Sequence, residues 1–308
     1  MARDSREIRL ALIQARCSTD VKANFELAVE RIREAAASGA QIVCLQELFQ
    51  TRYIGQVEDA EAFWLAEPVC AGAPTVSKLS QLAGELGVVL IAGLFENVDD
   101  LVYYNTAAVL DANGSYLGKY RKVHIPDDPL YYEKFFFRPG DLGYPTFRTR
   151  FGTLGVLICW DQWFPEAARL MALGGAEILF YPTAIGIAQH PGELELDTEL
   201  RASWQLVQRG HAIANACFVA AVNRVGLERD ERNEAGIHFF GSSFVCHPTG
   251  RVLAEASDQV EETLLVDVDL AEVSRARREW AYFFRDRRVD SYAELQRSYR
   301  ERESTHRE

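Results

Sequence analysis

Apolar and polar positions along the chain follow the periods of short strands and amphipathic helices. Mostly apolar runs predict three buried strands: residues 8–14, 41–45 and 88–95. Apolar side chains at helical spacing predict two helices between them, residues 21–38 and 74–86, each followed by a glycine. Residues 103–110 and 116–122 flank the turn sequence Asp111-Ala-Asn-Gly114, and this pattern predicts a hairpin.

The same order of elements then starts again. Leu12-Ile-Gln14, at the end of the first predicted strand, corresponds to Leu157-Ile-Cys159, and the stretch ending at Glu47 corresponds to the one ending at Thr183. Further predicted elements of the second half are a helix that starts at Pro165, a helix over 198–216 and a strand over 218–225. The spacing of the first hairpin also recurs, at residues 245–253.

Two such units, each a sheet covered by helices on one face, can bury their bare faces against each other. The sequence therefore predicts an α/β fold, a four-layer α-β-β-α sandwich with an internal pseudo-twofold repeat. A doubly wound sheet is the alternative, but it would not require two hairpins.

We expect residues 1–308 to form one domain with a C-terminal tail. Residues 269–279 read as a helix capped by Asp269. The aromatic and basic run Trp280-Ala-Tyr-Phe-Phe-Arg-Asp-Arg-Arg288 follows it. Such a run is unfavourable in water, so we expect the tail, about 280–308, to pack on a partner subunit. Residues 123–145 lack periodicity and read as a long loop of the kind that is often functional.

Composition excludes several classes of protein. The chain has 308 residues, 48% of them hydrophobic, and a net charge of −12 with scattered Lys and Arg, which argues against nucleic-acid binding. It has no apolar run long enough for a membrane span, and its start has no secretory signal. Six widely spaced cysteines without a C-x-x-C pair favour a reducing, cytoplasmic location. The six histidines form no ligand cluster, so no metal is expected.

Three polar residues stand at the ends of predicted strands. Cys159 lies in a sharp strand-to-helix connection, where α/β sheets place reactive groups, while Glu47 and Lys122 end two other strands. Singly, each has a structural explanation: a core thiol, a helix-start carboxylate and a surface charge. Together they supply a nucleophile, a base and a cation.

Three ordered motifs carry a family resemblance over residues 8 to about 288. They are Leu45-Gln-Glu47-Leu-Phe, Tyr120-Arg-Lys122-Val-His-Ile-Pro126 and Val156-Leu-Ile-Cys159-Trp-Asp-Gln-Trp-Phe-Pro-Glu166. With them the chain resembles the nitrilase, or carbon–nitrogen hydrolase, superfamily. The resemblance implies the sandwich fold, a catalytic set of Glu47, Lys122 and Cys159, and a supporting carboxylate at Glu133. It also implies a homodimer or larger homo-oligomer acting on a small molecule without a cofactor.

Within the superfamily the chain is most similar to N-carbamoylputrescine amidases. Matches include Tyr132-Glu133-Lys-Phe, Gly175-Ala-Glu-Ile-Leu-Phe-Tyr-Pro-Thr-Ala-Ile-Gly186 and Phe284-Arg-Asp-Arg-Arg288. The resemblance implies hydrolysis of N-carbamoylputrescine to putrescine, CO2 and ammonia through an acyl-enzyme. The chain departs from that pattern directly after Gly186, where it reads Ile187-Ala-Gln-His190-Pro. Another N-carbamoyl compound, a small amide or a nitrile therefore remains an alternative substrate.

Four residues are candidates for lining the substrate pocket: Trp160, Asp161, Tyr53 and Tyr132. Four loop acids could bind a cationic group, although a run of charges is usually a solvated surface: Glu193, Glu195, Asp197 and Glu199. Two rival interpretations remain open. A papain-like hydrolase would use a histidine as base, with His124, His211 and His238 as candidates. A binding or assembly protein would use the same fold without catalysis.

Overall fold

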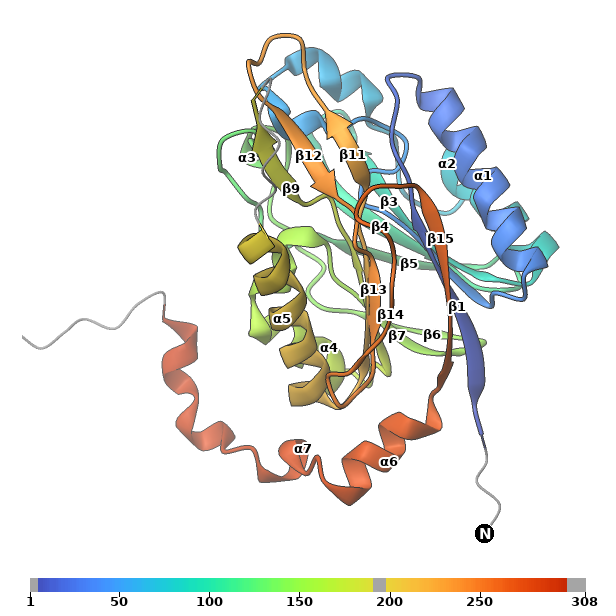
Figure 1. Ribbon diagram of the computed structural model, residues 1–308, viewed down its shortest axis with the longest axis vertical. Coiled ribbons are helices and arrows are strands. Elements are labelled where there is room, and N and C mark those ends of the chain that lie inside the picture. Colours follow the sequence, from blue (N-terminus) through green and yellow to red (C-terminus); the bar gives the residue numbers. More distant parts are fainter. Residues whose placement is uncertain (1–4, 191–197, 298–308) are drawn as a thin grey trace, which may run out of the picture.

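Two six-stranded sheets pack face to face between two layers of helices in the computed structural model (Figure 1). The structure describes residues 5–190 and 198–297. Helices α1 and α2 cover the outer face of one sheet, and α4 and α5 cover that of the other (Figure 1). The predicted four-layer α-β-β-α sandwich is therefore confirmed.

The first sheet has the order β15-β1-β2-β3-β4-β5. Its strands are β1 (Glu7–Gln14), β2 (Ile42–Leu45), β3 (Val89–Val98), β4 (Val102–Leu110), β5 (Tyr116–Arg121) and β15 (Glu262–Asp269). β1, β2 and β3 are mutually parallel, and the other neighbours pair antiparallel.

The second sheet has the order β14-β13-β10-β8-β7-β6. Its strands are β6 (Thr146–Thr149), β7 (Gly152–Val156), β8 (Ile178–Pro182), β10 (Phe218–Val222), β13 (Phe244–Cys246) and β14 (Val252–Glu255). The run β1-β2-β3-β4-β5 thus corresponds, strand for strand, to β7-β8-β10-β13-β14. This is the internal repeat read from the sequence.

Side chains alternate between two cores, as the period of a strand requires. In β1, Leu10 and Leu12 face the second sheet, whereas Ala11 and Ile13 face the helices. Helix α1 (Val21–Ala37) starts after Asp20, whose carboxylate accepts hydrogen bonds from two backbone amides. Helix α2 (Pro74–Leu86) starts with proline and ends at Gly87, which has a φ of +68°. The second sheet is covered by α4 (Pro165–Leu173) and α5 (Thr198–Asn215).

The predicted strand over 218–225 was wrong at its end. β10 stops at Val222, and the chain leaves the sheet because the Asn223 side chain binds the backbone of Ile185 and Gly241. The chain continues as β11 (Val225–Glu228) in a third, three-stranded sheet with β12 (Gly236–Phe240) and β9 (Gly186–Gln189). This small sheet joins an aromatic cluster over one end of the sandwich, together with α3 (Glu133–Phe136) from the predicted long loop.

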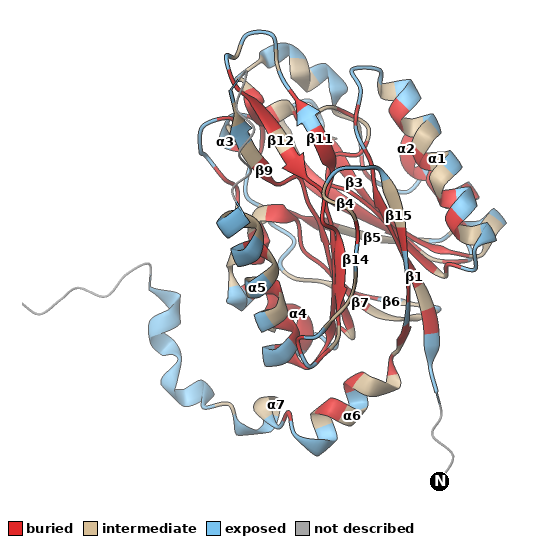
Figure 2. Cartoon of the chain, viewed as in Figure 1, coloured by how far each residue is buried: buried red, intermediate tan, exposed pale blue. Residues whose placement is uncertain are grey.

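The C-terminal segment differs in detail from the prediction. The helix α6 spans Ala271–Glu279, and Asp269 belongs to β15 while its carboxylate accepts the amide of Ala271. After α6 come α7 (Phe283–Asp286) and the 3-10 helices Val289–Ser291 and Ala293–Gln296. The Phe284 ring of this tail lies 5.1 Å from the guanidinium of Arg169 in α4. Beyond α7 the tail is largely exposed (Figures 1 and 2).

Candidate active site

A buried ammonium lies between two buried carboxylates at one end of the sandwich. Lys122 Nζ donates to Glu47 Oε1 at 2.8 Å, and to the two oxygens of Glu133 at 2.9 and 2.7 Å. All three side chains are almost fully buried. The structure therefore brings together three of the four residues named as catalytic candidates.

Three different elements position these residues, and backbone contacts fix Lys122. Glu47 follows β2, Lys122 directly follows β5, and Glu133 is the first residue of α3. The amide of Lys122 donates to Asn105 O, and its carbonyl accepts from Gly140 N, each at 2.8 Å. A side chain at Gly140 would place its Cβ 2.1 Å from Arg121 O, so glycine permits this close approach.

Cys159 lies at a strained turn after β7. It is the first residue of the 3-10 helix Cys159–Trp163, and its φ of +43° is in the left-handed region that non-glycine residues avoid. The thiol donates to Ala184 O at 3.7 Å. Burial raises the pKa of the Cys159 thiol well above its usual value, Glu47 raises it further, and Lys122 acts in the opposite direction. The charges of Glu47 and Lys122 therefore act directly on the thiol.

Burial and charge set the protonation of the cluster. Burial by itself would lower the pKa of Lys122, but the carboxylates of Glu133 and Glu47 outweigh it and raise that pKa. Lys122 therefore stays an ammonium ion. Burial raises the pKa of Glu133, and the neighbouring Lys122 counteracts this effect.

The four pocket candidates have different surroundings. The hydroxyl of Tyr53 donates to Glu133 Oε1 at 2.6 Å, which links Tyr53 to the cluster. Tyr132 precedes α3 and is half-buried, and Trp160 is half-buried beside Trp163. The carboxylate of Asp161 is fully buried. It accepts four hydrogen bonds: from Tyr120 Oη, Ile158 N, His124 N and His124 Nδ1. These contacts support a positioning role for Asp161.

Sequence reasoning missed three residues around the cluster. Asn105 donates to Glu47 Oε1 at 2.6 Å, and its only sequence signal is an amide within a largely apolar strand. Arg224, fully buried, donates to the backbone oxygens of Glu47 and Leu48. Tyr131, next to a named candidate, exchanges hydrogen bonds with the backbone of Gly186.

The loop acids and the histidines were the remaining candidates for the site. Glu193, Glu195 and Asp197 lie outside the described residues, and Glu199 lies in the first turn of α5. Two of the candidate histidines form hydrogen bonds with residues other than Cys159: His124 binds Asp161, and His211 binds Gln162 O at 2.8 Å. Within the described residues these contacts offer no support for a papain-like pair.

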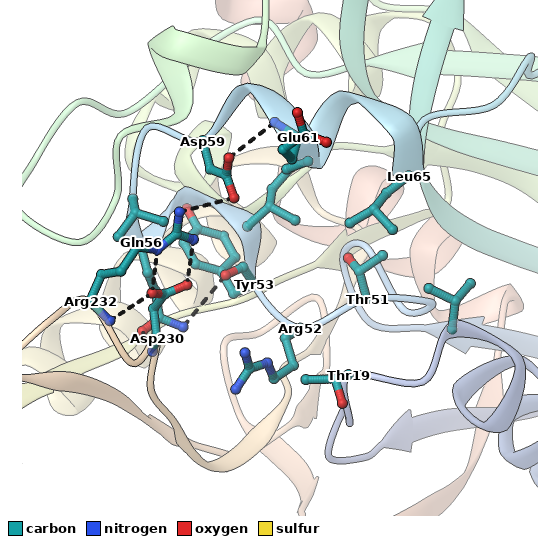
Figure 3. A pocket seen from close by; sticks show the side chains of 14 residues that line it. Thr19, Thr51, Arg52, Tyr53, Gln56, Asp59, Glu61, Leu65, Asp230 and Arg232 are labelled. Atoms are coloured by element: carbon teal, nitrogen blue, oxygen red, sulfur yellow. Dashed lines mark hydrogen bonds and ion pairs between the residues drawn. The ribbon is translucent and has the colours of Figure 1, made fainter.

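A separate hollow of about 300 Å³ opens beside Tyr53 (Figure 3). Arg232 bridges Asp59 and Asp230 at its rim, with closest distances of 3.1 and 2.8 Å. Tyr53 lines this hollow, while its hydroxyl reaches Glu133. In residues 5–190 and 198–297, no group of His, Cys, Asp and Glu is arranged to hold a metal ion. No helix in those ranges is long and apolar enough to cross a membrane.

Comparisons with known proteins agree with the geometry. A family model described as carbon–nitrogen hydrolase matches residues 9–278. An N-carbamoylputrescine amidase from Arabidopsis thaliana is 46% identical over 292 residues, which cover 94% of this chain and 95% of the relative. A citrullinase from Francisella tularensis is 40% identical and covers 95% of this chain and 99% of the relative. The crystal structure of a carbon–nitrogen hydrolase from Helicobacter pylori G27 superposes with a TM-score of 0.87 at 41% identity, covering 96% of this chain and 100% of that one.

Proposed function

The chain belongs to the carbon–nitrogen hydrolase family, and from this premise we propose that it hydrolyses N-carbamoylputrescine to putrescine, CO2 and ammonia. The family and the relatives make it an amidohydrolase that acts on a small molecule. The observation that carries the proposal is the Lys122 ammonium held between Glu47 and Glu133 beside a strained cysteine. Relatives with that activity match nearly the whole chain.

Cys159 is the proposed nucleophile and Glu47 its base. Because burial and Glu47 keep the pKa of the thiol high, Cys159 rests as a thiol rather than as a thiolate. Transfer of its proton to Glu47 then accompanies attack of the sulfur on the ureido carbon. A resting thiol also protects the buried site from a second uncompensated negative charge.

Lys122 is the proposed electrostatic stabiliser. The carbonyl oxygen of the substrate becomes negative in the adduct, and a buried ammonium is most effective in such a water-poor place. The backbone N–H of Trp160, directly after the nucleophile, is the second proposed donor. Removing one donor of this kind costs about 10²–10³ in rate. Glu133 and its donor Tyr53 keep the ammonium in position.

The second half of the reaction reverses these roles. Glu47 returns its proton to the departing ammonia and then activates a water that hydrolyses the carbamoyl-enzyme. The released carbamic acid loses CO2 and leaves the amine. No step requires a metal or an organic cofactor.

The far end of the substrate distinguishes two candidate functions. A citrullinase is also among the relatives, and citrulline shares the ureido group but carries an amino acid at its far end. The first residues of the segment that departs from the amidase pattern, Ile187 to Gln189, belong to β9, and Ala188 is exposed. Hydrolysis of citrulline or another N-carbamoyl compound is therefore the second candidate function. A nitrile would use the same residues but pass through a thioimidate.

Ammonia release from a panel of substrates tests the proposal. The panel contains N-carbamoylputrescine, citrulline, N-carbamoyl-β-alanine, a simple amide and a simple nitrile, each also with Cys159→Ala. We expect the cationic ureido compound to be turned over best. A preference for citrulline would replace the substrate and keep the mechanism. A Glu47→Gln variant with nearly normal turnover would contradict the mechanism and favour a different base.

We also propose that the C-terminal tail packs on a second copy of the chain, in the cytoplasm. The tail leaves Val289 65% and Leu295 67% exposed, which is costly for a segment that stays in water. All six cysteines are free, as in a reducing compartment. Sedimentation of the full chain and of a chain ending at Tyr282 tests the assembly. The full chain should be a dimer or larger and the shortened chain smaller; equal masses would contradict the proposal.

A further inference from the structure

Asn105 is a buried amide that contacts both the base and the cation of the proposed mechanism. It lies in the middle of β4, is fully buried, and pairs with Phe95 of β3. Its Nδ2 donates to Glu47 Oε1 at 2.6 Å, and its backbone oxygen accepts the amide of Lys122 at 2.8 Å. One strand residue therefore holds a side chain from the end of β2 and the backbone at the end of β5.

The two oxygens of Glu47 have different surroundings. Oε1 accepts from both Asn105 Nδ2 and Lys122 Nζ. Oε2 is buried and has no hydrogen-bond partner among the described residues. A buried carboxylate oxygen without a donor costs free energy, and in a native structure such an atom calls for an explanation.

The orientation of the Asn105 amide follows from chemistry. An ionised carboxylate only accepts, so the amide nitrogen must face Glu47, since the reverse orientation would place two acceptors 2.6 Å apart. This leaves Asn105 Oδ1 as a second buried acceptor without a donor among the described residues. A residue placed only to satisfy buried polar atoms would not add another unsatisfied one.

The ionisable groups around Glu47 come from four different elements. Lys122 ends β5, Glu133 begins α3, Cys159 begins the 3-10 helix after β7, and Arg224 follows β10. Arg224 donates to the backbone oxygen of Glu47 and not to its carboxylate. Of the charged groups near Cys159, Glu47 has the largest effect on the pKa of the thiol, which it raises.

We propose that Asn105 is a positioning residue, which fixes the Glu47 carboxylate so that Oε2 carries the proton during the reaction. This inference rests on the proposed function and adds the atom and the residue that orients it. The S–H bond of Cys159 breaks, its proton moves to Oε2, and the sulfur bonds to the ureido carbon while the carbonyl electron pair moves to oxygen. When the C=O bond re-forms, the C–N bond breaks and the nitrogen takes the proton from Oε2 and leaves as ammonia.

Two substitutions of Asn105 test the proposal against a merely structural role. In Asn105→Ala the carboxylate loses one of its two anchors, and we expect kcat to fall about 100-fold, the scale of a small misplacement, with KM little changed. In Asn105→Asp a second carboxyl group faces Glu47. Because like charges disfavour ionisation, the acidic limb of the kcat/KM profile should move to higher pH.

The matched control is Thr106→Val on the same strand. Thr106 is also fully buried, but its hydroxyl donates to Glu96 Oε2, away from Glu47. This variant should lose stability and keep the wild-type pH profile. Iodoacetamide supplies a readout independent of turnover, since alkylation of Cys159 should slow in Asn105→Ala and not in Thr106→Val.

The outcomes separate the inference from the proposed function. Wild-type pH profiles and wild-type alkylation rates in both Asn105 variants would overturn the inference, whatever their stability. If Glu47→Gln and Cys159→Ala are then still inactive, the proposed function stands without it. If those two variants remain active, the proposed function is contradicted, and the inference about Asn105 falls with it.

Discussion

Glu96 offers the sharpest test of how the fold anchors β5 to the rest of its sheet. Its carboxylate is buried in β3 and accepts four hydrogen bonds. Arg121 donates to both oxygens, at 2.7 and 2.8 Å, Thr106 donates at 2.7 Å, and Lys119 supplies the fourth. Arg121 and Lys119 belong to β5, the strand that Lys122 follows, so Glu96 ties this strand end to the sheet.

Glu96→Gln keeps the shape and removes the charge. One oxygen remains to accept two donors, while the new amide group faces the other two, so two charged or buried hydrogen bonds are lost. At about 1.5–3 kcal/mol for each such bond, the expected loss of unfolding free energy is about 3–6 kcal/mol. Urea denaturation at pH 7 measures it.

The pH dependence gives a second check. Burial alone would raise the pKa of Glu96, but hydrogen bonds from Arg121 and Lys119 outweigh it and hold that pKa below its ordinary value of 4.5. A lowered pKa means that the stabilisation is complete above about pH 4.5 and is lost as the pH falls through the lower folded-state value. The difference between wild type and Glu96→Gln should therefore shrink in acid.

Asp141→Asn is the matched control. Asp141 accepts from the same Arg121 at 2.8 Å, but its side chain is 54% exposed. Solvent screens such a pair, so the expected loss is below about 1 kcal/mol. A Glu96→Gln loss no larger than that of Asp141→Asn, or a loss independent of pH, would refute the reasoning.

Three further substitutions have expected outcomes. Arg224→Met removes a buried guanidinium that binds the backbone of Glu47, and we expect a loss of about 3–5 kcal/mol in urea denaturation; a loss below 1 kcal/mol would contradict that. Tyr53→Phe removes the donor to Glu133, and kcat should fall about tenfold for a bond of roughly 1.5 kcal/mol; an unchanged kcat would disprove its role. Gly140→Ala puts a Cβ 2.1 Å from a backbone oxygen, so both melting temperature and activity should fall, and unaltered values would argue against the close approach.

Much of the fold was readable from the sequence because each strand and helix carries its own periodicity. Helix α2 was predicted to the residue, since proline starts it and glycine ends it. The repeat was visible because Leu12-Ile-Gln14 at the end of β1 resembles Leu157-Ile-Cys159, which directly follows β7. Period alone cannot show where a strand leaves its sheet, and Asn223 ends β10 through side-chain contacts with distant backbone.

β15 shows a different limit. Its alternating pattern, Leu264 and Val266 inward with Leu265 and Asp267 outward, is typical of a strand, yet no strand was predicted there. Its partner is β1, more than 240 residues away, as in the pair Ile8 with Val268. β15 joins the first sheet from near the other end of the chain. It therefore lies outside the sequence repeat from which the other strands of that sheet were predicted.

The candidate site was readable where a residue type stands at a strand end. Glu47 and Lys122 were predicted in this way, and in the structure Lys122 Nζ lies 2.8 Å from Glu47 Oε1. Asn105 was missed because its role depends on the tertiary contact between β4 and the end of β2, which no local pattern encodes. Asp161 was named for the pocket, whereas its contacts tie the turn of Cys159 to Tyr120 and His124.

The central claim is that Cys159 is the nucleophile of a carbon–nitrogen hydrolase. Its most direct test is the rate of ammonia release from N-carbamoylputrescine by wild type, Cys159→Ala and Cys70→Ser, the last being a change at the exposed cysteine. We expect Cys70→Ser to match wild type and Cys159→Ala to lose a factor of about 10⁴ or more, as loss of a nucleophile does elsewhere. A Cys159→Ala variant that retains a tenth or so of the wild-type rate would contradict the account, since removing the proposed nucleophile should cost far more than that.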